Sequence, residues 1–139
     1  MTSYLLDVNA LIALIDPTHV HHERAHRWFL DEGSFDWITV PITENGVVRI
    51  VSHPSYSNTQ PVPVAMSSLR SACAVGGHRF EPDAVSVLDL DDPILSSNQV
   101  TDVYLVALSR SLSAQLATFD RKIGTDPIVG SGDAVALIP

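Results

Sequence analysis

Short apolar segments alternate with segments of helical periodicity along this chain, and that alternation is the strongest constraint on its fold. Ser3–Leu6 has β character and ends at Asp7, and Asn9–Ile15 then has the pattern of a short helix. Strands that alternate with helices predict a parallel sheet with helices on both faces. We therefore expect an α/β protein, a three-layer α/β/α sandwich with a central parallel sheet.

Proline, glycine and apolar spacing place the remaining elements. Pro41 suits a first helical position, and Gly76-Gly77 is a helix stop. We expect further helices from Thr18 to about Glu32, from Pro41 to Val51, over Val64–Val75 and over Val100–Leu112. We expect the other strands at Asp36–Val40, Ala84–Leu90, Gln115–Phe119 and Ala134–Ile138.

Length and composition predict one soluble domain over residues 1–139. The single cysteine, Cys73, cannot form an internal disulfide, which favours a reducing cytoplasm. Met1–Leu6 lacks the layout of a signal peptide, and the apolar stretch Val8–Ile15 is too short to span a bilayer. We expect a cytoplasmic protein with no membrane partner.

The net charge is −8, from eight Lys and Arg against sixteen Asp and Glu. This balance argues against a nucleic-acid binder that relies on a basic surface. Bound divalent cations, however, convert an acidic pocket into a site for phosphate.

Four acids stand where such a pocket forms. Asp7 and Asp120 each follow a predicted strand, whereas Glu44 and Asp102 lie in the first turn of predicted helices. Sites in open parallel sheets form beyond the carboxyl ends of the strands, so these carboxylates could converge. They would repel one another unless a hard cation lay between them. No Cys or His lies beside these acids in the sequence, which favours Mg²⁺ or Mn²⁺ over zinc.

Each of these residues also has a purely structural interpretation. An acid in a first helical turn offsets the helix dipole, and an Asp that closes a strand is often a turn residue. Asp7 is harder to explain this way, because it places a charge between two core segments. His22 and His26 could share a helical face that binds zinc, but a solvated face is the simpler interpretation. Cys73 is expected to be a buried, inert thiol.

Five stretches of the chain, in this order, resemble one known family, the PIN-domain ribonucleases of the VapC toxin type. They are Tyr4–Leu14 with its Asp-x-Asn step, His19–Trp28, Thr43-Glu44 before Val47–Arg49, Gln99–Leu108 and Leu116–Arg121. The resemblance implies a PIN-like α/β/α nuclease domain that hydrolyses RNA with a metal-activated water. It also implies a type II toxin–antitoxin system, with a cognate antitoxin protein and a homodimer as partners.

The same resemblance assigns residues to roles. It implies that Asp7, Glu44, Asp102 and Asp120 are the catalytic acids that hold Mg²⁺ or Mn²⁺, and that Asn9 and Thr118 support them. The basic residues that we expect to contact RNA phosphates are Arg24, Arg27, Arg121 and Lys122.

Two other functions stay open at this point. A Mg²⁺-dependent phosphatase could use Asp7 as its nucleophile, although such enzymes place a second Asp two residues later, where this chain has Asn9. A non-toxin PIN-like module that binds a protein partner would need no catalysis. A cluster of repelling acids argues against such a module.

Overall fold

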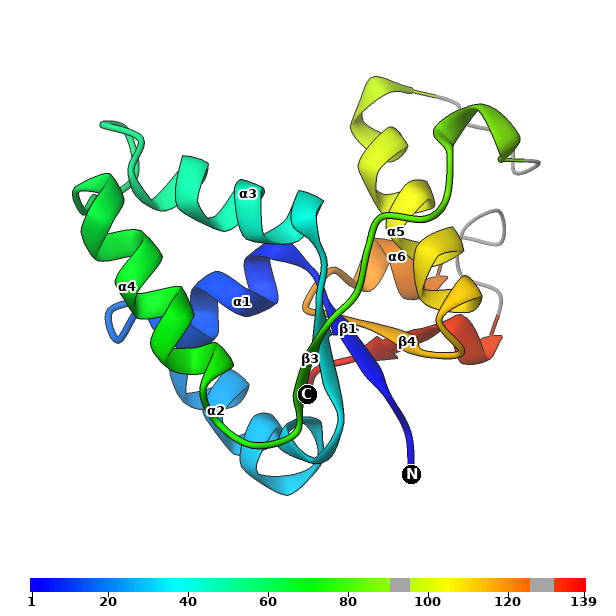
Figure 1. Cartoon of the computed structure of the whole chain (residues 1–139), viewed down its shortest axis with the longest axis horizontal. Helices are drawn as coiled ribbons and strands as arrows, with labels where there is room; N and C mark the ends of the chain where they lie inside the picture. The colour runs from blue at the N-terminus through cyan, green and yellow to red at the C-terminus, as the bar shows by residue number, and fades with distance from the viewer. Residues whose placement is uncertain (91–95, 126–131) are drawn as a thin grey trace.

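The computed structural model describes residues 1–90, 96–125 and 132–139. Its described strands form one parallel sheet in the order β3-β2-β1-β4-β5 (Figure 1). The strands are β1 (Tyr4–Leu6), β2 (Trp37–Thr39), β3 (His78–Phe80), β4 (Gln115–Thr118) and β5 (Val135–Leu137). The first strand is central, so its carboxyl end lies between those of β2 and β4.

Helices cover both faces of the sheet, which confirms the predicted three-layer α/β sandwich (Figure 1). One face carries α1 (Val8–Ile15), α2 (His22–Asp31), α3 (Pro41–Val51) and α4 (Val62–Cys73), and the other carries α5 (Val100–Ser111) and α6 (Arg121–Thr125). Short 3₁₀ turns lie at Gly33–Phe35, Val87–Asp89, Ser97–Gln99 and Gly132–Ala134.

The two faces have separate apolar cores because successive strand residues point to opposite sides. On β1, Leu6 packs with α1 to α4, whereas Leu5 packs with α5. Both leucines are essentially inaccessible to solvent. A strand buried on both faces needs an uninterrupted apolar run, which is what Tyr4-Leu5-Leu6 supplies.

The strand predicted at Ala84–Leu90 is wrong. The third strand is His78–Phe80, and residues 87–89 form a 3₁₀ turn in which Leu88 is 90% exposed. The Ser86 hydroxyl accepts a hydrogen bond from the Leu88 amide at 3.2 Å, which favours the turn. The real strand escaped prediction because it lies at the sheet edge and pairs only with β2, so partly exposed His and Arg are tolerated there.

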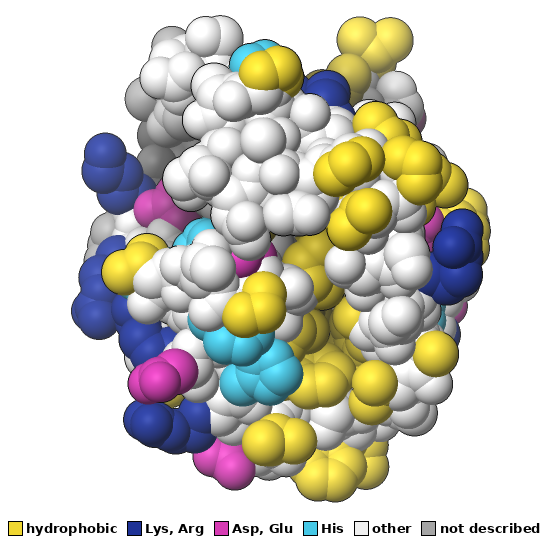
Figure 2. Space-filling view, turned by 90° about the vertical axis from the view of Figure 1, so that its left-hand side faces the viewer, with side chains coloured by type: hydrophobic (Ala, Val, Ile, Leu, Met, Phe, Trp, Pro, Cys, Tyr) yellow, Lys and Arg dark blue, Asp and Glu magenta, His cyan; other side chains and the backbone are white. Residues whose placement is uncertain are grey.

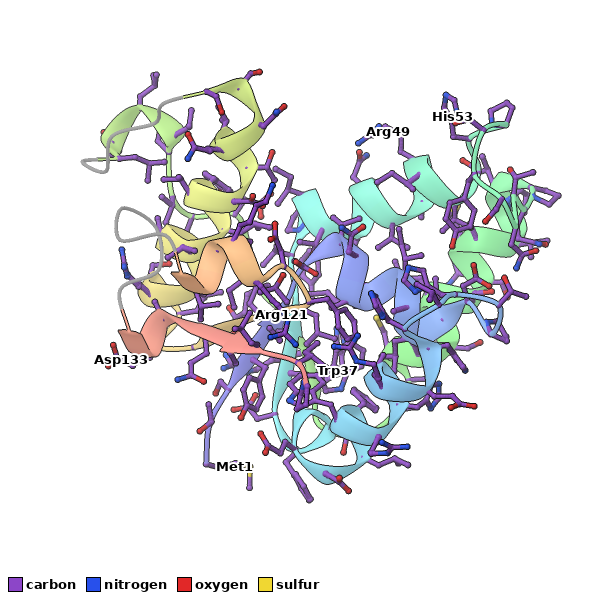
Figure 3. The ribbon with its side chains drawn as sticks, turned by 180° about the vertical axis from the view of Figure 1, so that it is seen from behind. Met1, Trp37, Arg49, His53, Arg121 and Asp133 are labelled. Atoms are coloured by element: carbon purple, nitrogen blue, oxygen red, sulfur yellow. The ribbon has the colours of Figure 1, made fainter. Side chains whose placement is uncertain are left out.

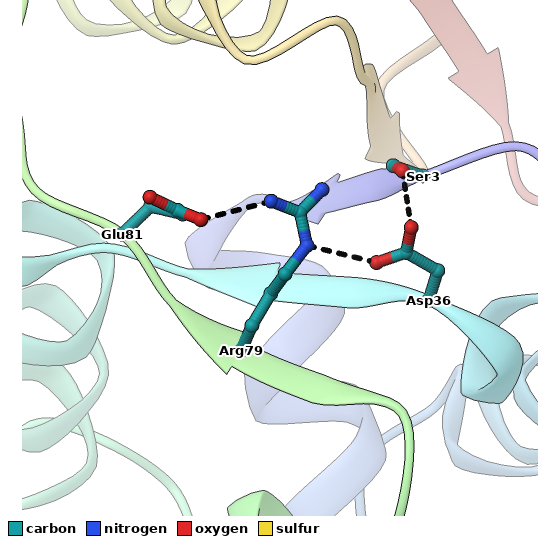
Figure 4. Close-up of polar contacts among 4 residues, drawn as sticks. All are labelled: Ser3, Asp36, Arg79 and Glu81. Atoms are coloured by element: carbon teal, nitrogen blue, oxygen red, sulfur yellow. Dashed lines mark hydrogen bonds and ion pairs between the residues drawn. The ribbon is translucent and has the colours of Figure 1, made fainter.

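Polar contacts hold this edge strand in register (Figure 4). Arg79 donates to Asp36 at 3.0 Å and to Glu81 at 2.8 Å, and Asp36 also accepts from the Ser3 hydroxyl. Gly77 precedes the strand with a φ of +88°, and a Cβ there would lie 1.9 Å from the Ser34 carbonyl oxygen. Only glycine fits that approach, so Gly77 fixes where β3 begins.

The second helix starts later than expected. Thr18 was predicted to cap it, but α2 begins at His22. The Thr18 amide and hydroxyl instead donate to the Asp16 carboxylate at 2.9 and 2.8 Å, forming a tight turn after α1. Among the described residues, no helix has both the length and the apolar character needed to cross a membrane.

Candidate active site

Asp7 lies at the carboxyl end of the central strand and caps the helix that follows. Its Oδ1 accepts a hydrogen bond from the Ala10 amide at 2.7 Å. Only 8% of the residue is exposed. Its neighbour Leu6 belongs to the core, and its neighbour Val8 packs against that core. Thr118, at the end of β4, lies beside the Asp7 carboxylate and lowers its pKa. Asp7 is therefore fixed by groups from α1 and β4.

Two further acids meet Asp7 at this edge. Asp120 follows β4, and its amide donates to the Thr118 hydroxyl oxygen at 3.0 Å. Asp102 lies half-buried in the first turn of α5. The charges of Asp102 and Asp120 both act on the Asp7 carboxyl, so three of the four predicted acids lie in one neighbourhood, next to the threonine that was expected to support them. Unlike the atoms of Glu44, Cys73 and His78 described below, the carboxylate oxygens of these three acids do not all lie within 4.8 Å of one another.

Burial and neighbouring charges both act on Asp7 and Asp102. Burial raises the pKa of Asp7 to about 6, against hydrogen bonds from Thr118 and Ala10 that lower it, and the charges of Asp102 and Asp120 raise it further. Burial, followed by the charge of Asp120, also raises the pKa of Asp102. A cluster of carboxylates that resists full ionisation is suited to a divalent cation, and its donors are the oxygen atoms that Mg²⁺ and Mn²⁺ prefer.

Glu44 points to a different set of side chains. Its Oε2 accepts from the Thr39 hydroxyl at 2.6 Å, and the same hydroxyl lies 2.7 Å from the His78 Nε2. Potential ligand atoms of Glu44, Cys73 and His78 all lie within 4.8 Å of one another. In this conformation, Glu44 belongs to a mixed cluster between α3, α4 and β3.

The backbone nevertheless keeps Glu44 close to the start of α1. Gly46, two residues later, packs against Val8, and a Cβ at Gly46 would lie 2.8 Å from a Val8 methyl group. Thr43 stabilises this end of α3, since its hydroxyl accepts from the Val40 amide at 3.2 Å. The helix start that carries Glu44 thus contacts the residue next to Asp7.

Sequence reasoning missed Cys73 and His78 as neighbours of an acid. Cys73 is far from Glu44 along the chain, and His78 lies on the strand that was misplaced. A correct third strand would have put His78 beside Trp37, two residues before Thr39 on the same strand, in the β2–β3 register. The apolar pattern offered no signal for this strand.

The other predicted residues occupy the surface. Asn9 is exposed in the first turn of α1, and Arg121 and Lys122 are exposed at the start of α6, next to Asp120 (Figure 3 labels Arg121). Arg27 is exposed on α2. Arg24 has a structural contact, because it donates to the Pro139 carbonyl at 2.7 Å.

The two histidines of α2, for which zinc binding was the less favoured interpretation, have structural contacts. The rings of His22 and His26 hydrogen-bond the carbonyls of Ala13 and Leu14, at 2.7 and 3.1 Å. These carbonyls end α1 and have no partner within that helix. Nearby, a groove of about 620 Å³ opens between α1, α2 and α4, and Figure 2 shows hydrophobic side chains gathered in a hollow on this face. Its apolar lining includes Leu14, Ile15, Phe29, Val64, Ala72 and Val75.

Comparison with known proteins returns several relatives of similar length, all from Mycobacterium tuberculosis. Ribonuclease VapC38 is 41% identical over 126 residues, which are 87% of each chain. Ribonuclease VapC39 is 40% identical over 131 residues, covering 91% of this chain and 94% of the relative. Ribonuclease VapC44 is 40% identical over 131 residues, covering 91% and 92%.

The chain belongs to the VapC ribonuclease family. This confirms the resemblance stated from the sequence and the predicted class of enzyme, and it decides against the phosphatase alternative. No protein-family model matches the chain.

A solved structure supports the fold independently. The crystal structure of M. tuberculosis VapC20, described as a toxin that cleaves the sarcin–ricin loop, matches with a TM-score of 0.61. The match covers 93% of this chain and 98% of VapC20, at 15% sequence identity. At that identity, the likeness establishes a VapC-like fold.

Proposed function

We propose that this VapC-family protein is a Mg²⁺- or Mn²⁺-dependent endoribonuclease and the toxin of a type II toxin–antitoxin pair. The observation that carries the proposal is the burial of Asp7 beside Asp102 and Asp120 at the carboxyl edge of the sheet. A folded chain gains no stability from three mutually repelling acids, so a ligand that reverses their charge explains their placement best.

The residues of this cluster have distinct tasks in the proposal. Thr118 and the Ala10 amide would orient Asp7, whose carboxyl is close enough to Asp102 and Asp120 for their charges to raise its pKa. A bound Mg²⁺ or Mn²⁺ would supply an activated water and relieve charge at the scissile phosphate. Asp7, Asp102 and Asp120 would hold it, and Glu44 would join them after its carboxylate leaves Thr39.

The substrate in this proposal is RNA, approached from the side of α6. Arg121 and Lys122 directly follow Asp120 and are exposed, so they could contact phosphates on either side of the cut. Arg27 is a further candidate on α2, whereas the contact of Arg24 with the chain's last carbonyls favours a structural role for that residue. Asn9, exposed beside the cluster, would orient substrate or water.

We also propose a cognate antitoxin and a second copy of the chain as protein partners, with the cytoplasm as the place of action. The single cysteine is compatible with a reducing compartment. Light scattering of the purified chain, alone and with its antitoxin, tests both assemblies through the measured mass.

The decisive experiment for the activity is the mapping of 5′ ends in total RNA after brief expression of the wild type or Asp7→Asn. We expect discrete new ends with the wild type and none with the variant, while circular dichroism shows that both are folded. New ends at equal yield with Asp7→Asn would overturn the role of Asp7. Absence of Mn²⁺ binding in a calorimetric titration of the wild type would favour the non-catalytic protein-binding module.

A further inference from the structure

We propose that Glu44, Cys73 and His78 form a second metal site, specific for Zn²⁺, on the opposite side of β1 from the aspartate cluster. Their potential ligand atoms lie within 4.8 Å of one another. They come from three elements, because Glu44 is on α3, Cys73 ends α4 and His78 begins β3. A tetrahedral zinc site places ligand atoms about 3.5 Å apart, from metal–ligand bonds of about 2.0–2.3 Å, so modest side-chain rotation would close the site.

The chemistry of the donors selects the ion. A thiolate, an imidazole and a carboxylate match Zn²⁺, whereas Mg²⁺ prefers oxygen ligands alone. Three protein ligands leave the fourth tetrahedral position for water. The two clusters of this protein therefore have different preferences, with oxygen donors at Asp7 and mixed donors at Glu44.

A buried hydroxyl organises the three ligands. Thr39 is fully buried at the end of β2, and its Oγ1 lies 2.6 Å from the Glu44 Oε2 and 2.7 Å from the His78 Nε2. Thr39 also lies near the Cys73 thiol and lowers its pKa, against the larger effect of burial that raises it. Residues that orient metal ligands in this way tune the affinity for the metal. Trp37 also supports His78, because their ring centroids lie 4.6 Å apart.

The site is open to solvent. Glu44 and Cys73 line a groove of about 560 Å³ between α3 and α4, together with Met66, Arg70 and Phe80. An ion can therefore enter without unfolding the core. Cys73 itself is partly exposed and free of any disulfide.

Occupation of this site has a consequence for catalysis, which rests on the function proposed above. Zn²⁺ bound by Cys73 and His78 would hold the Glu44 carboxylate next to Thr39 and withhold it from Asp7. Zinc would then inhibit the nuclease without entering the aspartate cluster. The side chain of Glu44 would act as the link between the two sites.

Binding is tested with Co²⁺, a coloured substitute for Zn²⁺, added to the metal-free full-length chain without thiol reductants. The chain has one cysteine, so a thiolate-to-cobalt absorption band can come only from Cys73. We expect a band that saturates at one ion per chain and disappears when Zn²⁺ is added. Cys73→Ser should abolish it, and His78→Asn should weaken binding at least about tenfold, since even outer-sphere changes cost about 10–100-fold.

His53→Asn is the matched control, because His53 is exposed and lies at the far end of α3 from Trp37, the packing partner of His78 (Figure 3). It should bind Co²⁺ like the wild type. Absence of the band in the wild type, or unchanged affinity in His78→Asn, would overturn the site.

Cleavage assays in Mg²⁺ test the link to catalysis. Cys73→Ser should cleave RNA at the wild-type rate but require at least about tenfold more Zn²⁺ for inhibition. Equal zinc sensitivity of the two proteins would overturn the link, because zinc would then act elsewhere. If the wild type cleaves nothing while the cobalt band depends on Cys73 and His78, the nuclease proposal fails and the zinc site stands.

Discussion

Two clusters flank the central strand, and they are built on the same plan with different donors. On one side, the buried Thr118 at the end of β4 contacts Asp7 and the Asp120 amide. On the other side, the buried Thr39 at the end of β2 contacts Glu44 and His78. Both threonines have no solvent exposure. In each case, a strand that pairs with β1 ends in a threonine, and the hydroxyl of that threonine contacts ionisable side chains at the sheet edge.

The difference between the clusters lies in burial and in donor type. Asp7 is nearly inaccessible and lies near the carboxylates of Asp102 and Asp120, whereas Glu44 is half-buried beside a thiol and an imidazole. Burial raises the pKa of the Cys73 thiol and lowers that of the His78 imidazole, which keeps both groups neutral without a metal. The same backbone plan thus yields one buried cluster of carboxylates and one partly exposed cluster of mixed donors.

The largest effect is expected from removal of an acid in the aspartate cluster. Asp102→Asn should reduce Mg²⁺-dependent cleavage at least about a hundredfold, because it removes a proposed metal ligand. Gel-based cleavage rates measure this, with the exposed Asp89→Asn as a control that should stay at the wild-type rate. If Glu44→Gln is as defective as Asp102→Asn, Glu44 serves the aspartate cluster during catalysis. A wild-type rate for Glu44→Gln would restrict it to the mixed cluster.

The pH dependence of the free energy of unfolding should reveal the burial of Asp7. Its folded-state pKa of about 6 exceeds the ordinary 3.8, so its contribution is complete below about pH 4 and is lost as the pH rises through 6. At about 1.4 kcal/mol per pKa unit, the metal-free wild type should lose about 3 kcal/mol relative to Asp7→Asn between about pH 4 and 7. Urea unfolding in EDTA measures the difference, and Mg²⁺ should reduce it at neutral pH. Parallel pH profiles for the two proteins would contradict a buried, ionised Asp7.

Replacement of each of the two threonines by valine, in separate variants, compares the clusters directly. Thr118→Val removes a hydroxyl from Asp7 and should lower stability by about 1–3 kcal/mol, together with Mn²⁺ affinity. Thr39→Val should leave Mn²⁺ affinity nearly unchanged and weaken Co²⁺ binding at the mixed cluster. Calorimetry with each ion measures both affinities. The comparison between clusters fails if each variant affects the two ions equally.

The smallest effect is expected on RNA affinity. Lys122→Ala should weaken binding several-fold and reduce the salt dependence by about one counterion, because Lys122 stands beside the aspartate cluster. Arg70→Ala, in the groove of the mixed cluster, should change neither. Fluorescence anisotropy over a range of salt, with catalysis blocked by Asp7→Asn, makes the measurement. If Arg70→Ala lost more RNA affinity than Lys122→Ala, RNA would bind on the other side of β1.

The inner strands were predicted because they are buried on both faces. Tyr4–Leu6 and the Leu116-Ala117 pair of β4 are the apolar segments that an inner strand requires. The edge strand β5 was also predicted, since Ala134–Ile138 is entirely apolar. The pattern fails at the other edge. His78–Phe80 pairs at an edge and is held by ion pairs of Arg79, which no hydrophobic periodicity records.

The position of some site residues could be predicted from the sequence, and that of others could not. The proximity of Asp7 and Asp120 follows from strand order, because β1 and β4 are neighbours, whereas Asp102 is brought in by the first turn of α5. The conformation of Glu44 does not follow, since it depends on Thr39, Cys73 and His78, which meet only after β3 is placed correctly. A side chain that can choose between two sets of partners lies beyond what spacing along the chain can specify.

The pairing of the first strand with the fourth has a consequence during protein synthesis. Asp7 leaves the ribosome well before Thr118 and Asp120, and β1 can pair with β4 only after β4 has emerged. Until then, a nascent chain holds Asp7 without Thr118 beside it and without one of its acidic neighbours. If this cluster is what cuts RNA, the translating ribosome is safe from its own product until β4 has been made and has paired.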